Sequence, residues 1–330
     1  MDLPDSLDAV VPLLLGSKLR IAGTVALSVV VVIGAAAGLG VLGVPSVAAV
    51  DNEFAGVNNS TTTIETDLVV SNPNPVGITL GDVRIDYTVS MNDVRVATGD
   101  REGVSLAPGN STTELTTQMD NQQIPPWFAS HVRNGEQSQL TVDANVTAER
   151  LGRSKQFTIT RPIQTDLLGQ FSSNETRPVR ADDSALTGSP LVESPVMYVN
   201  ETDAEWGAVT SEETPINVDF VAYNPQDYPL TVSSIDYEIT MNDVLVGQGS
   251  SETNAAIPSE ATERVQTRTA ITNANLDEWW ASHLENDQVT DLQIRFYATV
   301  EVEGQSFRVP VRALDHQDTI ETHIFEDNAS

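Results

Sequence analysis

The sequence predicts an all-β protein, with two tandem antiparallel β-sandwiches that each carry one short α-helix, behind a single transmembrane helix. Three observations support this fold class. Residues 64–96 return, with small changes, at residues 216–246. Within each copy the side chains alternate with the period of strands that have one buried face. Ahead of both copies lies an apolar run long enough to cross a bilayer.

The repeat makes the chain a tandem duplication. The segment M-N-D-V at residues 91–94 returns at 241–244, and W-F-A-S-H at 127–131 returns as W-W-A-S-H at 279–283. Each copy spans about a hundred residues, the size of an ordinary domain. We therefore expect a cytoplasmic segment (1–18), a transmembrane helix (19–50), a first domain (51–164), a polar linker (165–202), a second domain (203–313) and an acidic tail (314–330).

The charge excludes one class of partner. The net charge is −30, from 47 acidic and 17 basic residues, and the only lysines are Lys18 and Lys155. A chain this acidic has no general affinity for nucleic acid, because phosphates are bound through clustered basic residues. In molar salt the Debye length falls to about 3 Å and self-repulsion is screened. The composition resembles that of proteins from halophilic archaea, which we take as the source.

The apolar run predicts the topology. Residues 19–50 carry a single charge, and about 20 such residues cross a bilayer. Basic residues lie at its N-terminal side (Lys18, Arg20) and acidic residues follow it, so the positive-inside rule places the N-terminus in the cytoplasm and both domains outside the cell. The alternative is a cleaved signal peptide, since residues 47–49 are small. The run is longer than the roughly 7–15 apolar residues of such peptides, which favours a membrane span.

Strands follow in each copy. In residues 64–70 and 216–222 mainly apolar residues occupy every second position, and in a strand these side chains would all face one side. An Asn-Pro pair ends each of these strands, because proline lacks an amide hydrogen. The next strand reaches Asn-Asp at residues 92–93 or 242–243 and is followed at once by another apolar segment. Asn and Asp tolerate positive φ, so we predict a hairpin with a two-residue turn in both copies.

One amphipathic helix interrupts the strands in each copy. Apolar and aromatic residues lie at helical spacing over residues 124–132 and again over 276–284. Pro125 and Pro126 fit the first turn of the first helix, and Asn275 is expected to cap the second. Residues 165–202 show no sustained period and are interpreted as a linker, with a short helix near 182–186. Residues 315–330 have the composition of a disordered tail.

These motifs, in this order, resemble the late-embryogenesis-abundant type-2 family, also called the water-stress and hypersensitive-response (WHy) domain. That family combines N-P-N-P, a strand with tyrosine, then L-N-G and a later glycine. The second copy departs from the pattern at residues 226–227, and aspartate stands where the family has the glycine of L-N-G. The matching residues are Asn72, Pro73, Asn74, Pro75, Tyr87, Asn92 and Gly99, then Asn224, Pro225, Tyr237, Asn242 and Gly249.

The resemblance implies an immunoglobulin-like or fibronectin-III-like sandwich without enzymatic activity or cofactor, linked to desiccation, osmotic or salt stress. We therefore expect a membrane-anchored protein with a structural or protective role. The single span followed by such domains also looks like plant hairpin-induced relatives. The alternative is a binding module of the cell envelope that takes a lipid or protein partner at the sandwich groove or the helix.

The histidines are the first candidates for chemistry. His131 and His283 occupy the same position on the two helices, on the apolar face, which favours a place in the core. His316 and His323 lie among acidic residues of the tail, in a spacing that matches no defined set of metal ligands. Nucleophile, phosphate-loop and zinc motifs are absent from the sequence, so we expect no catalytic residue and no metal site.

The aromatic pairs on the helices are the second candidates. Trp127 with Phe128, and Trp279 with Trp280, could form a lipid-binding or client-binding surface if a ring stays exposed. The other interpretation is that they anchor the sandwich cores, since the chain has few other large rings and such rings carry much of the burial in a core. We favour the core.

Overall fold

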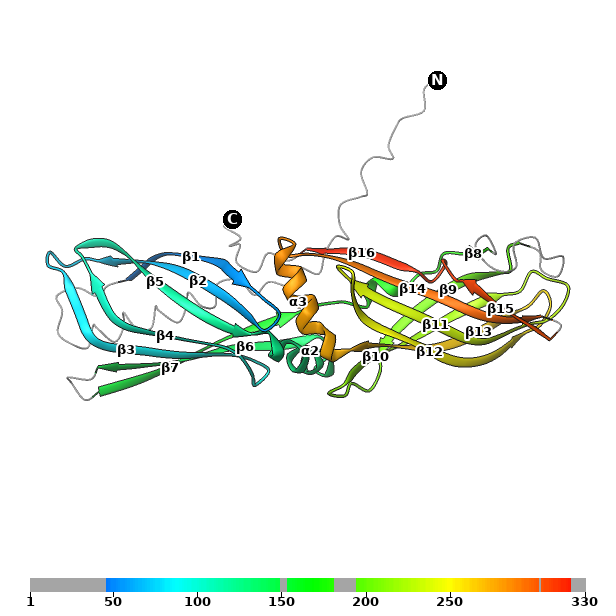
Figure 1. Ribbon diagram of the computed structural model, residues 1–330, viewed down its shortest axis with the longest axis horizontal. Coiled ribbons are helices and arrows are strands. Elements are labelled where there is room, and N and C mark those ends of the chain that lie inside the picture. Colours follow the sequence, from blue (N-terminus) through cyan, green and yellow to red (C-terminus); the bar gives the residue numbers. More distant parts are fainter. Residues whose placement is uncertain (1–45, 149–152, 181–193, 303, 322–330) are drawn as a thin grey trace, which may run out of the picture.

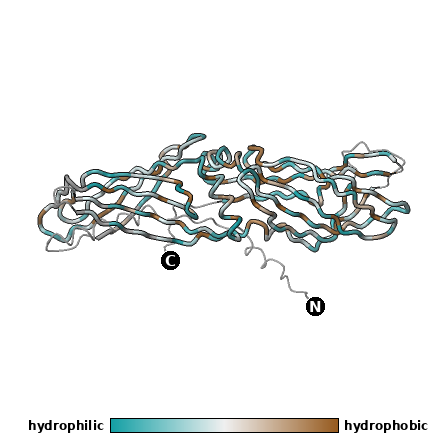
Figure 2. Tube along the Cα trace, turned by 90° about the horizontal axis from the view of Figure 1, so that it is seen from below, coloured by the Kyte–Doolittle hydropathy of each residue, from teal (hydrophilic) through white to brown (hydrophobic). Residues whose placement is uncertain are grey.

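The computed structural model describes residues 46–148, 153–180, 194–302 and 304–321. Within these ranges the chain forms two β-sandwiches placed end to end, with short helices where they meet (Figure 1). Apolar and polar residues alternate along the strands (Figure 2), and the apolar ones form the cores. This confirms a mostly β, antiparallel protein with two short helices.

The first sandwich is one sheet folded into two layers. It pairs in the order β1-β2-β5-β4-β3-β6-β7, and β4 meets β5 over only three residue pairs, which is where the sheet folds. The layers are therefore β1-β2-β5 and β4-β3-β6-β7. Its strands are β1 (Ser46–Val57), β2 (Thr61–Asn72), β3 (Ile78–Met91), β4 (Val94–Leu106), β5 (Gly109–Asp120), β6 (Gln137–Ala148) and β7 (Arg153–Gln164).

The second sandwich repeats this order in two separate sheets, β13-β10-β9-β8 and β12-β11-β14-β15, with β16 also paired to β14. Strands β9 to β15 correspond in sequence order to β1 to β7. The strands are β8 (Arg177–Val179), β9 (Met197–Trp206), β10 (Glu213–Tyr223), β11 (Leu230–Met241), β12 (Val244–Ile257), β13 (Thr262–Thr272), β14 (Val289–Val302), β15 (Gln305–Pro310) and β16 (His316–Glu321).

The predicted transmembrane helix lies mostly outside the described residues. Its last part, residues 46–50, lies inside them and belongs to β1, which pairs with β2 from Ser46 onward. The predicted end of the span was therefore wrong, because β-branched residues suit a strand as well as an apolar helix. Among the residues that the structure describes, no helix is long and apolar enough to cross a bilayer.

Two segments predicted to be irregular contain strands. β8 and most of β9 lie in the predicted linker, and β16 lies in the predicted tail. β15 and β16 together line the edge of β14 that corresponds to the edge of β6 covered by β7. The prediction failed because each strand has few apolar residues: β9 buries Met197 and Val199, and β16 has one apolar residue, Ile320, facing inward. The predicted helix at 182–186 and residues 322–330 lie outside the described residues.

The two hairpin turns were predicted correctly. Asn92 and Asp93 have φ of 48° and 65°, and Asn242 and Asp243 have 49° and 62°, the backbone of a type I′ turn. The asparagine also fixes the turn to the neighbouring strand. Asn92 Oδ1 accepts a hydrogen bond from the Gln139 amide at 2.9 Å, and Asn242 Oδ1 accepts one from the Asp291 amide at 2.8 Å.

The Asn-Pro motif closes the loop after β2 or β10 through buried hydrogen bonds. Asn72 is 1% exposed, and its Nδ2 donates to the Leu106 carbonyl at 3.3 Å. Asn224, which is fully buried, donates in the same way to the Ile257 carbonyl at 3.1 Å. Each side chain therefore ties its own loop to the end of β4 or β12. Pro73 and Pro75 are exposed, and Pro225 is half-buried.

The tyrosine and the later glycine of the motif are partners across two strands. Tyr87 pairs with Gly99, and Tyr237 pairs with Gly249. In both copies a Cβ on the glycine would meet the tyrosine ring. The ring therefore lies over the glycine, and in the first copy its hydroxyl hydrogen-bonds Thr117 Oγ1 at 2.6 Å.

We expect Gly99→Ala to lower the free energy of unfolding by about 1–3 kcal/mol, because the added methyl group displaces the Tyr87 ring from its packed position. Denaturant unfolding at fixed salt measures the loss. Gly56→Ala is the matched control, since a Cβ at Gly56 meets nothing within 4 Å. Equal stability of the two variants would contradict this account of the motif.

Candidate functional site

The two helices meet where the sandwiches join. α2 (Ile124–Arg133) and α3 (Leu276–Glu285) each follow a 3-10 turn, η1 (Asn121–Gln123) or η4 (Asn273–Asn275). α2 packs against α3 (Figure 1). The two 3-10 turns also pack across the junction, η4 against α2 and η1 against α3. Equivalent surfaces of the two copies thus face each other, as in an isologous dimer. Asn275 does not cap α3 as predicted: it has helical angles and donates to the Leu245 carbonyl instead.

A hydroxyl holds a tryptophan and a histidine together at each helix. Trp127 Nε1 donates to Ser138 Oγ at 3.0 Å, and His131 Nδ1 lies 2.8 Å from the same oxygen. In the second copy Thr290 replaces the serine, with Trp279 Nε1 at 2.9 Å and His283 Nδ1 at 2.7 Å. Both histidines are 1% exposed. Their repetition is explained by this shared buried contact.

The first histidine leads on to a buried carboxylate. His131 Nε2 and Thr165 Oγ1 are 2.8 Å apart, and Thr165 Oγ1 donates to Glu136 Oε2 at 2.8 Å. Because the threonine gives its hydrogen to the carboxylate, it accepts from His131, which therefore carries its proton on Nε2. Glu136 is 7% exposed and also accepts from the Leu167 amide at 2.6 Å.

Glu136 joins the two domains. Its other oxygen, Oε1, accepts a hydrogen bond at 2.8 Å from Nε1 of Trp206, the last residue of β9 in the second sandwich. One carboxylate thus connects the end of α2, the start of the linker and the second domain. Glu136 was not predicted from the sequence. No sequence motif marks this residue. Its backbone has a positive φ of 58°, and Gln288 repeats that conformation in the second copy without a carboxylate.

Ser138, His131 and Glu136 are the residue types of a hydrolytic triad, with Thr165 between the last two. Ser138 is 4% exposed, and its oxygen already accepts from Trp127 and from Asn92 Nδ2. A substrate therefore has no access to the hydroxyl. We interpret the group as structural.

Burial sets the protonation of both histidines. It lowers the pKa of His283 from 6.5 to about 4, and it also lowers the pKa of His131, where the Glu136 carboxylate opposes part of the effect. Both imidazoles are therefore neutral near pH 7.

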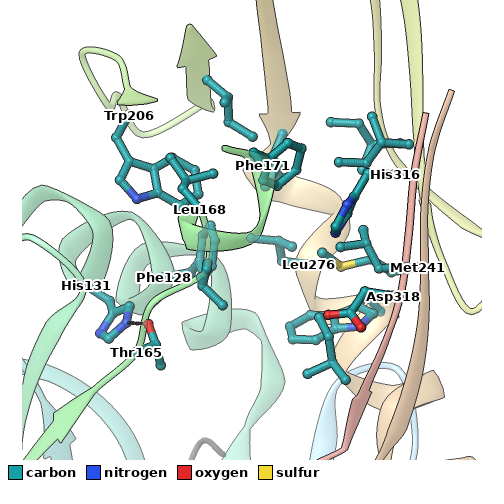
Figure 3. Close-up of a pocket in the computed structure, with 18 of the residues that line it drawn as sticks. Phe128, His131, Thr165, Leu168, Phe171, Trp206, Met241, Leu276, His316 and Asp318 are labelled. Carbon is teal, nitrogen blue, oxygen red and sulfur yellow. Dashed lines mark hydrogen bonds between the residues drawn. The ribbon is translucent and has the colours of Figure 1, made fainter. Parts of the chain in front are cut away.

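A cavity of about 110 Å³ lies at the junction, partly open to solvent (Figure 3). Its walls come from α2, from α3, from the open end of the second sandwich, from β16, and from the linker with its 3-10 turn η3 (Gly169–Phe171). Leu168 is 8% exposed, and Phe171 stacks on His316 with ring centroids 4.6 Å apart. The linker therefore covers the end of the second core.

All four predicted aromatic residues line this cavity. Trp127, Phe128 and Trp280 are 3%, 8% and 2% exposed, and Trp279 is half-buried. They are packed at the junction and also line the cavity, whereas the two interpretations from sequence were a place in the sandwich core and an exposed lipid-binding or client-binding surface. That the linker and β16 form part of the cavity wall was not predicted from the sequence.

The tail histidine belongs to this wall. His316 is half-buried in β16, and burial lowers its pKa. Neighbouring Asp315 accepts a hydrogen bond from the Phe296 amide at 2.9 Å, and burial raises the pKa of its carboxyl group. His323 lies outside the described residues. Within the described ranges no three His, Asp or Glu side chains cluster closely enough to hold a metal ion.

We expect Glu136→Ala to lower the free energy of unfolding by about 1.5–3 kcal/mol, because it leaves buried donors on Trp206 and Leu167 without an acceptor. Urea unfolding followed by tryptophan fluorescence measures the change. Glu114→Ala, at an exposed carboxylate, is the control and should stay within about 0.5 kcal/mol of the parent. A neutral Glu136→Ala variant would show that the domains are held by other contacts.

Stability should depend on pH through His283. Its pKa is lower in the folded chain, about 4 against 6.5, so below pH 6.5 the unfolded state binds the proton first. The stability present above pH 6.5 is then lost as pH falls toward 4, by about 3 kcal/mol in all. The measurement compares the unfolding free energy of the protein and His283→Gln from pH 8 to 4. Parallel curves would refute the assignment.

Comparison with known proteins identifies the family of this chain. A family model described as late embryogenesis abundant protein (LEA_2) matches residues 67–163 and 219–313. No curated protein matches the chain in sequence. The crystal structure of a protein from Archaeoglobus fulgidus is 23% identical, covering 38% of this chain and 99% of its own, with a TM-score of 0.36. The solution structure of a protein from Arabidopsis thaliana is 13% identical, covering 38% and 81%, with a TM-score of 0.30.

Proposed function

Because the chain belongs to the late embryogenesis abundant type-2 family, with two copies of its domain, we propose that it is a non-enzymatic protein with a structural or protective role under desiccation, osmotic or salt stress. One observation carries this proposal. The motif residues that repeat in both copies make turns, cross-strand packing and buried hydrogen bonds, so their chemistry serves the fold. The part of each sandwich that contacts its surroundings is mainly its acidic outer surface.

That surface suits high salt. The net charge of −30 repels itself at low ionic strength, and salt screens the repulsion. Ion pairs such as Arg84 with Asp86 lie on the surface, where a pair contributes little to stability. The acidic residues therefore act mainly by binding water and cations. This supports the proposal that the source is a halophilic archaeon.

The proposed location is the outer side of a cell membrane, with the chain anchored by its N-terminal apolar run. β1 begins at Ser46, which leaves residues 19–45 for the span, still more than the roughly 20 needed. The basic residues ahead of the run support a cytoplasmic N-terminus. Protease added to intact cells should then digest both domains; domains that survive until lysis would contradict this location.

The second candidate function is a binding module of the cell envelope for a lipid or protein partner. The junction cavity favours it, because Trp127, Phe128, Trp279 and Trp280 give that cavity aromatic walls and part of it is open to solvent. In this function the helices are the contact site, and the linker is the segment that a ligand meets.

A drying experiment tests the protective role. The full chain, dried with a dehydration-sensitive enzyme, should preserve more activity after rehydration than the same mass of a variant with neutral amides at five exposed carboxylates. The five positions are Glu65, Asp67, Glu114, Glu263 and Glu301. We expect protection to fall in the variant, because amides hold water and cations less strongly than carboxylates. Equal protection by both proteins would refute a role for the acidic surface.

A further inference from the structure

The sequence repeat continues into the segment that follows each domain. β7 ends at Gln164, which pairs with the first residue of β6, and β16 ends at Glu321, which pairs with the first residue of β14. Because β6 and β14 are equivalent, residue 322 stands where residue 165 stands in the first copy. Residues 165–168 are T-D-L-L and residues 322–325 are T-H-I-F. Both segments therefore have a threonine in the first position and apolar side chains in the third and fourth.

The first of these segments crosses from its own domain to the other one. Thr165 Oγ1 lies 2.8 Å from His131 Nε2 and donates to Glu136 Oε2 at 2.8 Å. The amide of Leu167 donates to the same carboxylate oxygen at 2.6 Å. Leu168, 8% exposed, lines the junction cavity together with Trp206 of β9 (Figure 3). The segment is thus held at the end of α2 in the first domain and covers the end of the second core.

The second copy repeats the groups that hold this segment. His283 occupies the helix position of His131, and its Nδ1 has the same kind of hydroxyl partner. Gln288 occupies the position of Glu136 after the helix and has the same backbone conformation, with φ of 62° against 58°. In the first copy a single oxygen, Glu136 Oε2, accepts both bonds of the segment. The one oxygen of a glutamine side chain, which has two lone pairs, can do the same.

The loss of the second carboxylate oxygen is matched in the opposite domain. Glu136 Oε1 accepts from Trp206 Nε1, and Trp206 pairs with Ile216. The equivalent residue of the first domain is Phe54, which pairs with Ile64 and has no N–H group in its side chain. The residue at the position of Glu136 therefore needs only one acceptor oxygen when phenylalanine replaces tryptophan. α3 packs against β1, the strand of Phe54, so the repeated groups meet at the junction.

We propose that residues 322–325 cross back over the junction and cover the first sandwich, as the segment after β7 crosses forward and covers the second. The threonine of this segment bonds to His283 and Gln288. Its fourth residue, Phe325, packs against Phe54 and covers the end of the first core. The two domains thereby exchange segments in the same two-fold manner in which α2 and α3 meet.

The occupant is this chain's own segment. Residue 322 follows Glu321 directly, and Glu321 is held beside α3 by its pairing with β14. A segment attached this close to its site binds at a high effective concentration, which a segment from a second molecule does not reach in dilute solution. The correspondence with the first copy ends at residues 326–327, where Glu-Asp stands in place of Gly-Gln of η3. The contact joins the two domains and does not depend on the proposed function.

Crosslinking tests the contact on the full chain. The sequence contains no cysteine, so two introduced cysteines react only with each other. Gly56→Cys with Glu326→Cys places one thiol near Phe54, where a Cβ meets nothing within 4 Å, and the other just after the segment. A short bismaleimide should link this pair within one molecule at least about tenfold faster than the control pair, Val76→Cys with Glu326→Cys. Val76 lies in the loop after β2, at the end of the first sandwich far from the helices.

Two crosslinking results would overturn the proposal. Equal rates for the two cysteine pairs would show that the segment does not lie on the first domain. Crosslinks between two molecules would show that it occupies the first domain of another chain.

Unfolding measures the strength of the contact. Phe325→Ala should raise the unfolding equilibrium constant by about 10- to 100-fold, because a large apolar side chain loses its buried position. Asn328→Ala, beyond the correspondence, is the control and should change the constant by no more than about twofold. In the Phe54→Ala background, which lacks the partner ring, Phe325→Ala should have a clearly smaller effect. An unchanged effect in that background would refute the contact between the two rings.

Discussion

Each β-sandwich has one end at which the apolar side chains between its sheets would meet water, and the two copies close these ends against each other. α2 and α3 lie across them, and the linker turn with Leu168 and Phe171 covers what remains open in the second copy. Glu136 holds the arrangement by accepting hydrogen bonds from the linker and from Trp206. The relative position of the domains therefore follows from the need to bury both ends.

Polar groups inside the junction are arranged so that nearly every donor has an acceptor. The tryptophan, hydroxyl and histidine cluster repeats in both copies, and the first copy extends it through Thr165 to a carboxylate. The neutral histidines fit this scheme, since a buried imidazolium would need a charge beside it. Trp280 Nε1 is an exception, because this buried donor has no hydrogen-bond partner in the described structure.

The features that could be predicted from the sequence are those that depend on residues close together in the chain. The hairpin turns follow from Asn-Asp between two apolar segments, and the helices follow from spacing within ten residues. Glu136 could not be predicted, because its partner Trp206 is 70 residues away. β16 could not be predicted either, since its hydrogen bonds depend on the edge of β14. The cavity exists only because the linker, α2 and β16 come together in space.

The symmetric meeting of α2 and α3 limits how this chain associates with others. A contact between equivalent surfaces closes on itself and cannot propagate into a filament. Here both surfaces belong to one polypeptide, so their local concentration is set by the linker, and crowding or dilution does not change it. A protein concentrated by loss of water can therefore keep its two most apolar ends occupied by each other, while like-charged outer faces keep separate molecules apart.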